Sequence, residues 1–357
     1  MPGVVDWFSP FGEIIRLPGR EISAADLAKA DVLLVRSITA VNEQLLQGSC
    51  VRFVGSATIG TDHVDLDYLA SRNIQFANAP GCNANAVIEY VLSCLAVQQP
   101  DWLAKRISVI GCGHVGGKML NLFHNLKVDA LGCDPFLDQT PDYMVKLDEA
   151  LAREIICVHT PLTVAGDHPT FHLLNSKTLV QITDGALLIN AGRGAVIDNQ
   201  ALLACLQQKR FRCALDVWEN EPHINRELLD VVDIATPHIA GYSLDGKVAG
   251  TRMVFEAFIR WLGRKQPDQL QELDGLGEVK DIQAISINDA ILQAYDVRRD
   301  DGLLKASPEE FDWLRKNSQQ RLEFSHYQVS NVKTALLAEQ LSHVGFSSQQ
   351  AGKSRED

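Results

Sequence analysis

Three side chains of the types that carry out proton transfer and anion binding follow predicted strands in the second half of the chain. His238, directly after Pro237, can act as a general base that removes a hydroxyl proton during an oxidation. Glu221 can orient that imidazole and stabilise its protonated form, although the spacing leaves open that Glu221 is a solvated loop acid. Arg193 has glycine on both sides, and its planar guanidinium suits a substrate carboxylate unless it is a surface residue on a turn. The other histidines have no comparable partner in the sequence and are interpreted as turn, helix or packing residues, among them His63, His114, His159 and His172.

A glycine-rich motif, G-x-G-x-x-G, lies between the apolar run 107–110 and a helical run over 118–126. In a strand–turn–helix unit, Gly111 permits the tight turn and Gly113 lets the backbone approach a pyrophosphate. Gly116 allows the helix to pack closely on the strand, and the free N–H groups at the helix start then face the anion. Such a triplet alone is often only a glycine-rich turn, so cofactor binding needs support from the residues that follow.

An acidic residue supplies that support. Asp134 ends the next predicted strand, 128–133, eighteen residues after Gly116. A carboxylate at this place accepts hydrogen bonds from the adenosine ribose and repels a 2′-phosphate, which predicts NAD rather than NADP. The alternative is that Asp134 only caps a turn before Pro135.

Composition limits the classes of partner and the compartment. A chain of 357 residues is expected to form two or three domains, and its net charge of −12 argues against nucleic acid or an anionic membrane as partner. The eight cysteines form no C-x-x-C pair, which is typical of small buried hydrophobic residues in a reducing cytoplasm. Neither a signal peptide nor a membrane-spanning apolar run is recognisable, and no metal site is predicted.

Apolar runs that alternate with helical patterns predict an α/β protein with parallel sheets. Strands are expected over 31–37 and 51–58, and then in a doubly wound pattern over 107–110, 128–133, 155–162, 186–191, 213–217 and 232–238. Helices are expected over 84–98, 199–209 and 244–262. The predicted fold is a discontinuous flavodoxin-like substrate domain (1–88 and 239–265), a Rossmann NAD-binding domain (89–238) and a small C-terminal α/β domain (270–357).

Taken together, these motifs resemble the D-2-hydroxyacid dehydrogenase family over residues 31–262. The glycine motif and the segments 159–162, 190–198, 216–222 and 236–238 fall in the family's order, and together they are highly specific. The resemblance implies NAD-dependent oxidation of a 2-hydroxy acid, with catalytic Arg193, Glu221 and His238. The residues that it places at the cofactor are Asp134, Thr160, Asp216 and Gly241, and those that it places at the substrate are Ser37, Thr58 and Tyr242.

Four stretches resemble one branch of the family more closely, a branch whose substrate is a phosphorylated 2-hydroxy acid: 35–37, 79–84, 238–242 and 295–301. The last stretch lies in the C-terminal region, which is similar to that branch's dimerisation domain and implies a homodimer. Arg36 is a candidate for binding the substrate phosphate, unless it is a solvent-facing arginine. The alternatives are another member of the family, of the 3-phosphoglycerate or hydroxypyruvate type, and an NAD-sensing binding protein that shares the fold.

The start of the chain differs from the family pattern. The first domain of relatives opens with a strand ahead of a segment like residues 1–10, and here the sequence begins at that segment. A parallel sheet without this strand leaves backbone groups unpaired, each of which costs about 1–3 kcal/mol if it is buried. We therefore expect that the natural start lies upstream of Met1, and that the 357-residue form melts below an extended one.

Overall fold

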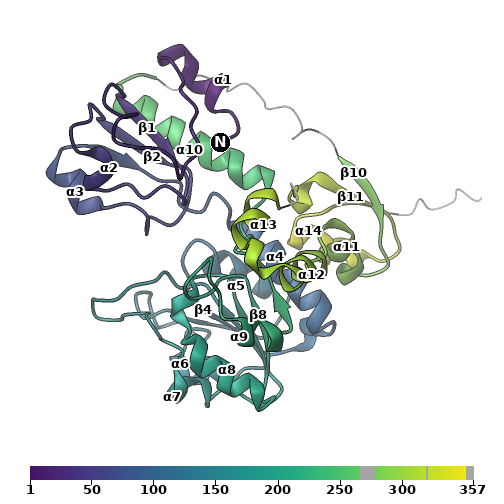
Figure 1. The fold of residues 1–357 in the computed structure, drawn as a ribbon. Coiled ribbons are helices and arrows are strands. Elements are labelled where there is room, and N and C mark those ends of the chain that lie inside the picture. Colours follow the sequence, from purple (N-terminus) through teal and green to yellow (C-terminus); the bar gives the residue numbers. More distant parts are fainter. Residues whose placement is uncertain (266–276, 278, 319–320, 351–357) are drawn as a thin grey trace, which may run out of the picture. The chain divides into compact units, whose positions relative to one another are not determined.

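The computed structural model describes residues 1–265, 277, 279–318 and 321–350 (Figure 1). The chain divides into two compact units, and each is described by itself. The first unit holds residues 1–83 and 243–277, and the second holds residues 84–242 and 278–357. The predicted class is confirmed, since both units are α/β with parallel sheets.

The second unit is built on a six-stranded parallel sheet in the order β5-β4-β6-β7-β8-β9, the doubly wound pattern predicted from the sequence. Its strands are β4 (Ile107–Ile110), β5 (Ala130–Cys133), β6 (Ile155–Val158), β7 (Leu187–Asn190), β8 (Arg212–Leu215) and β9 (Ile234–Ala235). Most of the residues in these strands are buried, because helices cover both faces of an all-parallel sheet.

The helices that connect these strands are α5 (Gly116–Asn125), α6 (Leu147–Leu151), α7 (Ser176–Leu179), α8 (Asn199–Gln207) and α9 (Arg226–Val231), and α4 (Ala84–Gln98) precedes the first of them, β4. The helix α4 has the bounds that the sequence predicted, and α8 begins at the predicted residue 199, where Asp198 accepts from two backbone N–H groups of the first turn. Short 3-10 turns lie at Trp102–Ala104 and Gly194–Val196.

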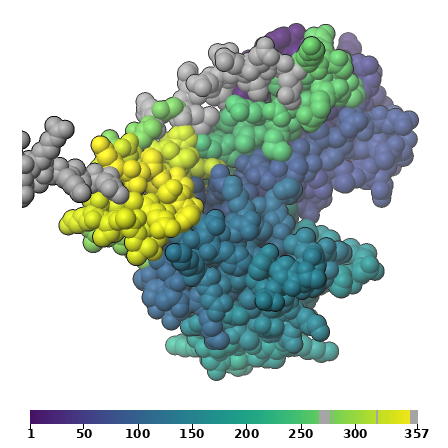
Figure 2. Space-filling view, turned by 180° about the vertical axis from the view of Figure 1, so that it is seen from behind, coloured from purple at the N-terminus to yellow at the C-terminus, as the bar shows by residue number. Residues whose placement is uncertain are grey.

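The C-terminal residues of this unit form a second, smaller parallel sheet in the order β10-β11-β12, with strands β10 (Lys280–Gln283), β11 (Tyr327–Val332) and β12 (Ser347–Gln350). Its helices are α11 (Ile287–Ala294), α12 (Arg298–Ala306), α13 (Phe311–Asn317) and α14 (Ala335–Val344), with 3-10 turns at Pro308–Glu310 and Phe324–His326. Figure 2 shows these residues, in yellow, directly against the blue part of the same unit.

One hydrophobic core joins the C-terminal residues to the larger sheet. Leu304, Phe311 and Leu314 belong to the same buried cluster as Trp218 of the loop after β8. The helix α11 of the C-terminal region also packs against α4. The described residues of the C-terminal region therefore share buried clusters with the larger sheet, and the predicted third domain over 270–357 stays a prediction.

The first unit has a three-stranded parallel sheet in the order β1-β2-β3, with β1 (Val32–Val35), β2 (Phe53–Ser56) and β3 (Gln75–Ala77). Its helices are α1 (Val4–Phe8), α2 (Glu43–Leu46), α3 (Leu66–Ser71) and α10 (Leu244–Trp261), with a 3-10 turn at Ser9–Phe11. The long helix α10 returns the chain to this sheet, as the sequence predicted. None of the described helices has both the length and the apolar character that crossing a bilayer requires.

The N-terminal segment is helical and supports the core of the first unit. Trp7 and Phe8 are buried, and their rings lie 6.2 and 5.0 Å from the ring of Phe255 in α10. Within the described residues, β1 pairs with a strand on one side only, where β2 lies. The expectation that the natural start lies further upstream stays a prediction.

Candidate active site

The clearest catalytic geometry is the contact between His238, which follows β9, and Glu221, which follows β8. The Nδ1 atom of His238 lies 2.7 Å from Oε2 of Glu221. The other carboxylate oxygen accepts the backbone N–H of Trp218 at 2.9 Å. In the neutral imidazole, the hydrogen on Nδ1 points toward the carboxylate and Nε2 keeps its lone pair; Nε2 has no partner among the described residues. Nε2 is therefore the candidate atom for accepting a proton.

The turn that presents His238 is held by a buried carboxylate. The backbone N–H of His238 donates to the carbonyl of Asp216 at 2.7 Å, and the residue has a left-handed φ of 57°. The Asp216 carboxylate accepts from the Thr236 hydroxyl and from the N–H groups of Ile239 and Ala240, at 2.7 to 2.9 Å. Burial raises the pKa of Asp216 above its ordinary value, against these hydrogen bonds and the charge of His238. In this structure Asp216 therefore fixes the His238 turn.

Glu221 is kept ionised by its neighbours. Burial alone would raise the pKa of its carboxyl group. The hydrogen bond and charge of His238, the N–H of Trp218 and the guanidinium of Arg315 outweigh burial, so the pKa lies below its ordinary value. An ionised Glu221 can stabilise the imidazolium that forms when His238 takes a proton.

Arg193 lies in a tight loop after β7 that packs on the Glu221 loop. The side chain of Asn190 is fully buried and holds this loop at both ends, because it donates to the carbonyl of Arg193 at 3.0 Å and accepts from the N–H of Gly192 at 3.1 Å. A Cβ at Gly194 would lie 2.0 Å from the backbone carbonyl of Trp218. Glycine is therefore required where the two loops meet.

The glycine motif has the geometry of a dinucleotide turn. Gly111 has a φ of +86°, and a Cβ there would lie 2.7 Å from the backbone nitrogen of Thr160. A Cβ at Gly116 would lie 1.9 Å from the carbonyl oxygen of Gly111, so only glycine lets the helix start pack on the turn. Nothing lies within 4 Å of a Cβ at Gly113, which leaves that part of the loop open to a ligand.

The side chains of Asp134 and Thr160, near this loop, differ in their hydrogen bonding. Asp134 accepts from the N–H of Cys112 at 2.9 Å and from that of Phe136 at 3.0 Å, so it caps the turn after β5 and also reaches the glycine loop. The hydroxyl oxygen of Thr160 is buried and has no hydrogen-bond partner in the described part of the chain. A buried hydroxyl without a partner fits a residue whose partner is a bound cofactor.

The remaining predicted site residues lie on both units. Arg36 and Ser37 follow β1 in the first unit, and Thr58 follows β2, where its hydroxyl contacts Ser56 at 2.7 Å. Gly241 and Tyr242 belong to the second unit and directly follow the His238 turn. The Tyr242 hydroxyl accepts from Nε of Arg315 at 3.1 Å.

Sequence reasoning missed two residues. Arg315, in α13, contacts both Tyr242 and Glu221. His172 was interpreted as a residue without a partner comparable to Glu221, and this was wrong, because its Nε2 lies 2.7 Å from Oε1 of Glu219. The pairs are distant in sequence, so no local spacing signals them.

His172 links three loops of the second unit. Its backbone N–H donates to the carbonyl of Ala195 at 2.8 Å, just after the Arg193 loop. Its ring partner Glu219 is two residues before Glu221 and also accepts the N–H of Asn199 at 2.8 Å. The ligand atoms of His172, Asp198 and Glu219 lie within 4.8 Å of one another, but both carboxylates already bind N–H groups at the start of α8. His172, Asp198 and Glu219 therefore hold these loops together by hydrogen bonds, and we call the three residues the clamp.

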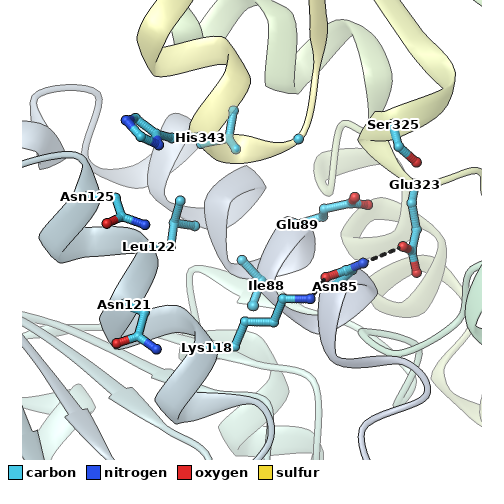
Figure 3. Close-up of a pocket in the computed structure, with 12 residues that line it drawn as sticks. Asn85, Ile88, Glu89, Lys118, Asn121, Leu122, Asn125, Glu323, Ser325 and His343 are labelled. Carbon is cyan, nitrogen blue, oxygen red and sulfur yellow. Dashed lines mark hydrogen bonds between the residues drawn. The ribbon is translucent and has the colours of Figure 1, made fainter.

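A cavity of about 320 Å³ lies elsewhere in the second unit (Figure 3). It is formed by α4, α5, the end of α14 and the segment 323–325, and no predicted site residue lines it. Asn85 donates to Glu323 across it at 2.9 Å, and Glu89 and Lys118 also line it. Its lining carries the carboxylates of Glu89 and Glu323 as well as the amine of Lys118, so it is not a cluster of positive charge.

Comparison with known proteins agrees with this geometry. Residues 94–240 match the family model of the D-isomer specific 2-hydroxyacid dehydrogenase NAD-binding domain, and residues 268–345 match a domain of unknown function. Among solved structures, the 3-phosphoglycerate dehydrogenase of Entamoeba histolytica with bound NAD⁺ gives a TM-score of 0.64 at 21% identity, covering 76% of this chain and 93% of that one. The D-lactate dehydrogenase of Aquifex aeolicus gives 0.59 at 22%, covering 68% and 86%. The fold is thus that of the D-2-hydroxyacid dehydrogenases, and the NAD-binding domain matches the model of that family.

Curated relatives give the particular branch. The erythronate-4-phosphate dehydrogenase of Teredinibacter turnerae is 46% identical, over 91% of this chain and 92% of its own length. The corresponding protein of Escherichia coli O157:H7 is 44% identical, over 92% of each chain. The chain therefore belongs to the erythronate-4-phosphate dehydrogenases, the branch that the sequence indicated.

Proposed function

We propose that the protein oxidises the C2 hydroxyl of 4-phospho-D-erythronate with NAD, giving (R)-3-hydroxy-2-oxo-4-phosphooxybutanoate for the biosynthesis of pyridoxal 5′-phosphate. The observation that carries the proposal is the 2.7 Å contact between His238 and Glu221, with Nε2 of the imidazole left to accept a proton. The relatives named above support the choice of substrate.

In the proposed reaction, Nε2 of His238 takes the hydroxyl proton while the hydrogen on C2 leaves as a hydride. When bound, NAD would supply the hydride acceptor, so that the alcohol would lose one proton and one hydride and become a ketone. Glu221 stabilises the imidazolium, and Arg193 binds the substrate carboxylate and polarises the C2 oxygen.

We assign the cofactor to the glycine loop and the residues around it. Gly111, Gly113 and Gly116 would receive the pyrophosphate, and Asp134 would receive the adenosine ribose. Thr160 would use its unpaired hydroxyl, while Asp216 and Gly241 complete the cofactor set by resemblance to the family. The cavity of Figure 3 contains none of these residues and is not part of the proposed site.

The substrate residues and the assembly are further parts of the proposal. Ser37, Thr58 and Tyr242 would contact the substrate, and Arg36 is the cation that the sequence offers for its phosphate. Residues 270–357 would form a dimerisation domain, and the protein would act as a cytoplasmic homodimer. Neither nucleic acid nor a membrane is a proposed partner, given the net charge of −12.

The test is to follow NADH formation with 4-phosphoerythronate, 3-phosphoglycerate and D-lactate in parallel. We expect 4-phosphoerythronate to give the highest kcat/KM. Faster turnover of 3-phosphoglycerate would assign the chain to another reaction of the family. NAD binding without turnover of any 2-hydroxy acid would identify an NAD-sensing protein instead.

A further inference from the structure

We propose that Arg315, from the C-terminal region, forms a phosphate-binding subsite with Tyr242 beside the acid–base pair. The inference rests on the proposed function, because it concerns how the same site selects a phosphorylated 2-hydroxy acid. It adds a cation to the site that is distant in sequence from all the predicted site residues.

The position of Arg315 is fixed by packing. Phe311 and Leu314, on the same helix α13, are 1% and 7% exposed and lie in the core cluster that contains Trp218. Since neighbours on a helix surface are three or four residues apart, Arg315 projects one turn beyond Phe311, on the side that faces the Glu221 loop. Its side chain is only 13% exposed.

The guanidinium of Arg315 uses one of its nitrogens in a hydrogen bond and leaves the other two available to a ligand. Its Nε donates to the Tyr242 hydroxyl at 3.1 Å, and its central carbon lies 5.9 Å from the centre of the Tyr242 ring. Its Nη1 lies 3.9 Å from Oε2 of Glu221, but that oxygen already has His238 at 2.7 Å. The two terminal nitrogens therefore make no hydrogen bond within the described residues, although a guanidinium has five donors in a fork that matches phosphate.

A second cation is needed for this substrate class. A phosphorylated 2-hydroxy acid carries a carboxylate and a phosphate, and Arg193 can bind only one of them. Because the chain has a net charge of −12, the attraction for a dianion must come from local positive charge. Arg315 provides such charge in a partly desolvated place, next to a tyrosine that the family pattern assigns to the substrate.

The location of Arg315 gives the C-terminal region a role in substrate selection. Residue 315 lies in the segment 268–345, which matches a domain of unknown function, and outside the NAD-binding domain matched over 94–240. The acid–base chemistry therefore comes from the shared domain, while the additional one supplies a cation for the phosphate besides the candidate Arg36.

The experiment compares Arg315→Ala and Arg315→Lys with the control Lys316→Ala, which removes one positive charge from an exposed neighbour on the same helix. NADH formation is measured with 4-phosphoerythronate and with unphosphorylated D-erythronate. We expect Arg315→Ala to lower kcat/KM for the phosphorylated acid about 30- to 100-fold, as for the loss of a charge-assisted hydrogen bond pair. The loss with D-erythronate should be at least about tenfold smaller, Arg315→Lys should recover part of the phosphate effect, and Lys316→Ala should match wild type.

Equal losses with both acids would overturn the proposal and show that Arg315 acts only through Glu221. Competitive inhibition by inorganic phosphate gives an independent measure, since Arg315→Ala should weaken it and an unchanged inhibition constant would contradict the subsite. A wild-type protein that fails to oxidise 4-phosphoerythronate refutes the proposed function, and direct titration of inorganic phosphate into wild type and Arg315→Ala still tests the subsite. Unchanged NAD affinity of the variants shows that they are folded.

Discussion

The His238 turn and the glycine loop lie in the same unit. They differ in whether the chain itself supplies hydrogen-bond partners for their buried polar groups. Around His238, the carboxylates of Glu221 and Asp216 together accept five hydrogen bonds from the chain itself. Around the glycine loop, the hydroxyl of Thr160 and both ring nitrogens of His159 are buried without a partner in the described residues.

This difference indicates how each region works. Hydrogen bonds that are complete before substrate arrives hold the imidazole in one tautomer, which is what a general base requires. Buried polar groups without partners are costly, and they persist where a ligand or a water completes them. The first region is therefore preorganised by the protein, and we expect the second to be completed by the cofactor.

Removing the preorganised base should have the largest effect. We expect His238→Ala to lower turnover at least about a hundredfold, because it removes the only group proposed to take the hydroxyl proton. Initial rates of NADH formation at saturating substrate measure this effect, with the exposed His168→Ala as control. Turnover close to wild type would remove His238 from the catalytic role.

A change at Asp134, in the proposed cofactor site, should affect the binding of NAD rather than the rate of the chemical step. Asp134→Ala removes the proposed ribose partner and its hydrogen bond to Cys112, so we expect NAD affinity to fall about tenfold. Discrimination against NADP should relax at the same time, because the repulsion of the 2′-phosphate disappears. Titration of both nucleotides into wild type and variant tests this, and a wild type that prefers NADP would show that the ribose assignment is wrong.

Disrupting the clamp of His172, Asp198 and Glu219, which joins the Arg193 and Glu221 loops, should have a smaller effect. His172→Ala removes the hydrogen bond to Glu219, and we expect kcat to fall about three- to tenfold while NAD affinity stays unchanged. His172 has a left-handed φ of 50°, which asparagine tolerates, so His172→Asn should recover most of the activity. An equal effect of both variants on NAD affinity and kcat would instead indicate general loss of structure.

The last prediction concerns stability and its dependence on pH, with no expected effect on activity. Burial lowers the pKa of His159 from 6.5 to about 4, so the folded protein keeps this ring neutral where the unfolded chain protonates it. The stability that the neutral ring contributes is complete above pH 6.5 and is lost as pH falls toward 4, by about 3 kcal/mol at most. Urea unfolding between pH 7 and 4 measures this effect. The free energy of unfolding should fall less steeply with falling pH in His159→Leu than in wild type, and equal pH dependence in the two proteins would contradict the prediction.

The sequence by itself determined the parts of this protein that depend on local patterns. Apolar runs and turn residues predicted the six-stranded sheet, and glycine spacing predicted the loop at Gly111. Both signals are local, because strand burial and left-handed turns depend on residues within one element. The positions of His238 and Glu221 after strands were predictable for the same reason, although their roles rested on resemblance to the family.

Only the tertiary structure decided which of these side chains meet. His238 and Glu221 are 17 residues apart, and their contact depends on β8 and β9 being neighbours in the sheet. Arg315 is more distant still, and the packing of Phe311 and Leu314 places its guanidinium next to the same carboxylate. Side-chain pairing between distant segments follows from strand order and core packing, and an arginine or histidine has the same local sequence pattern whether it faces solvent or a site.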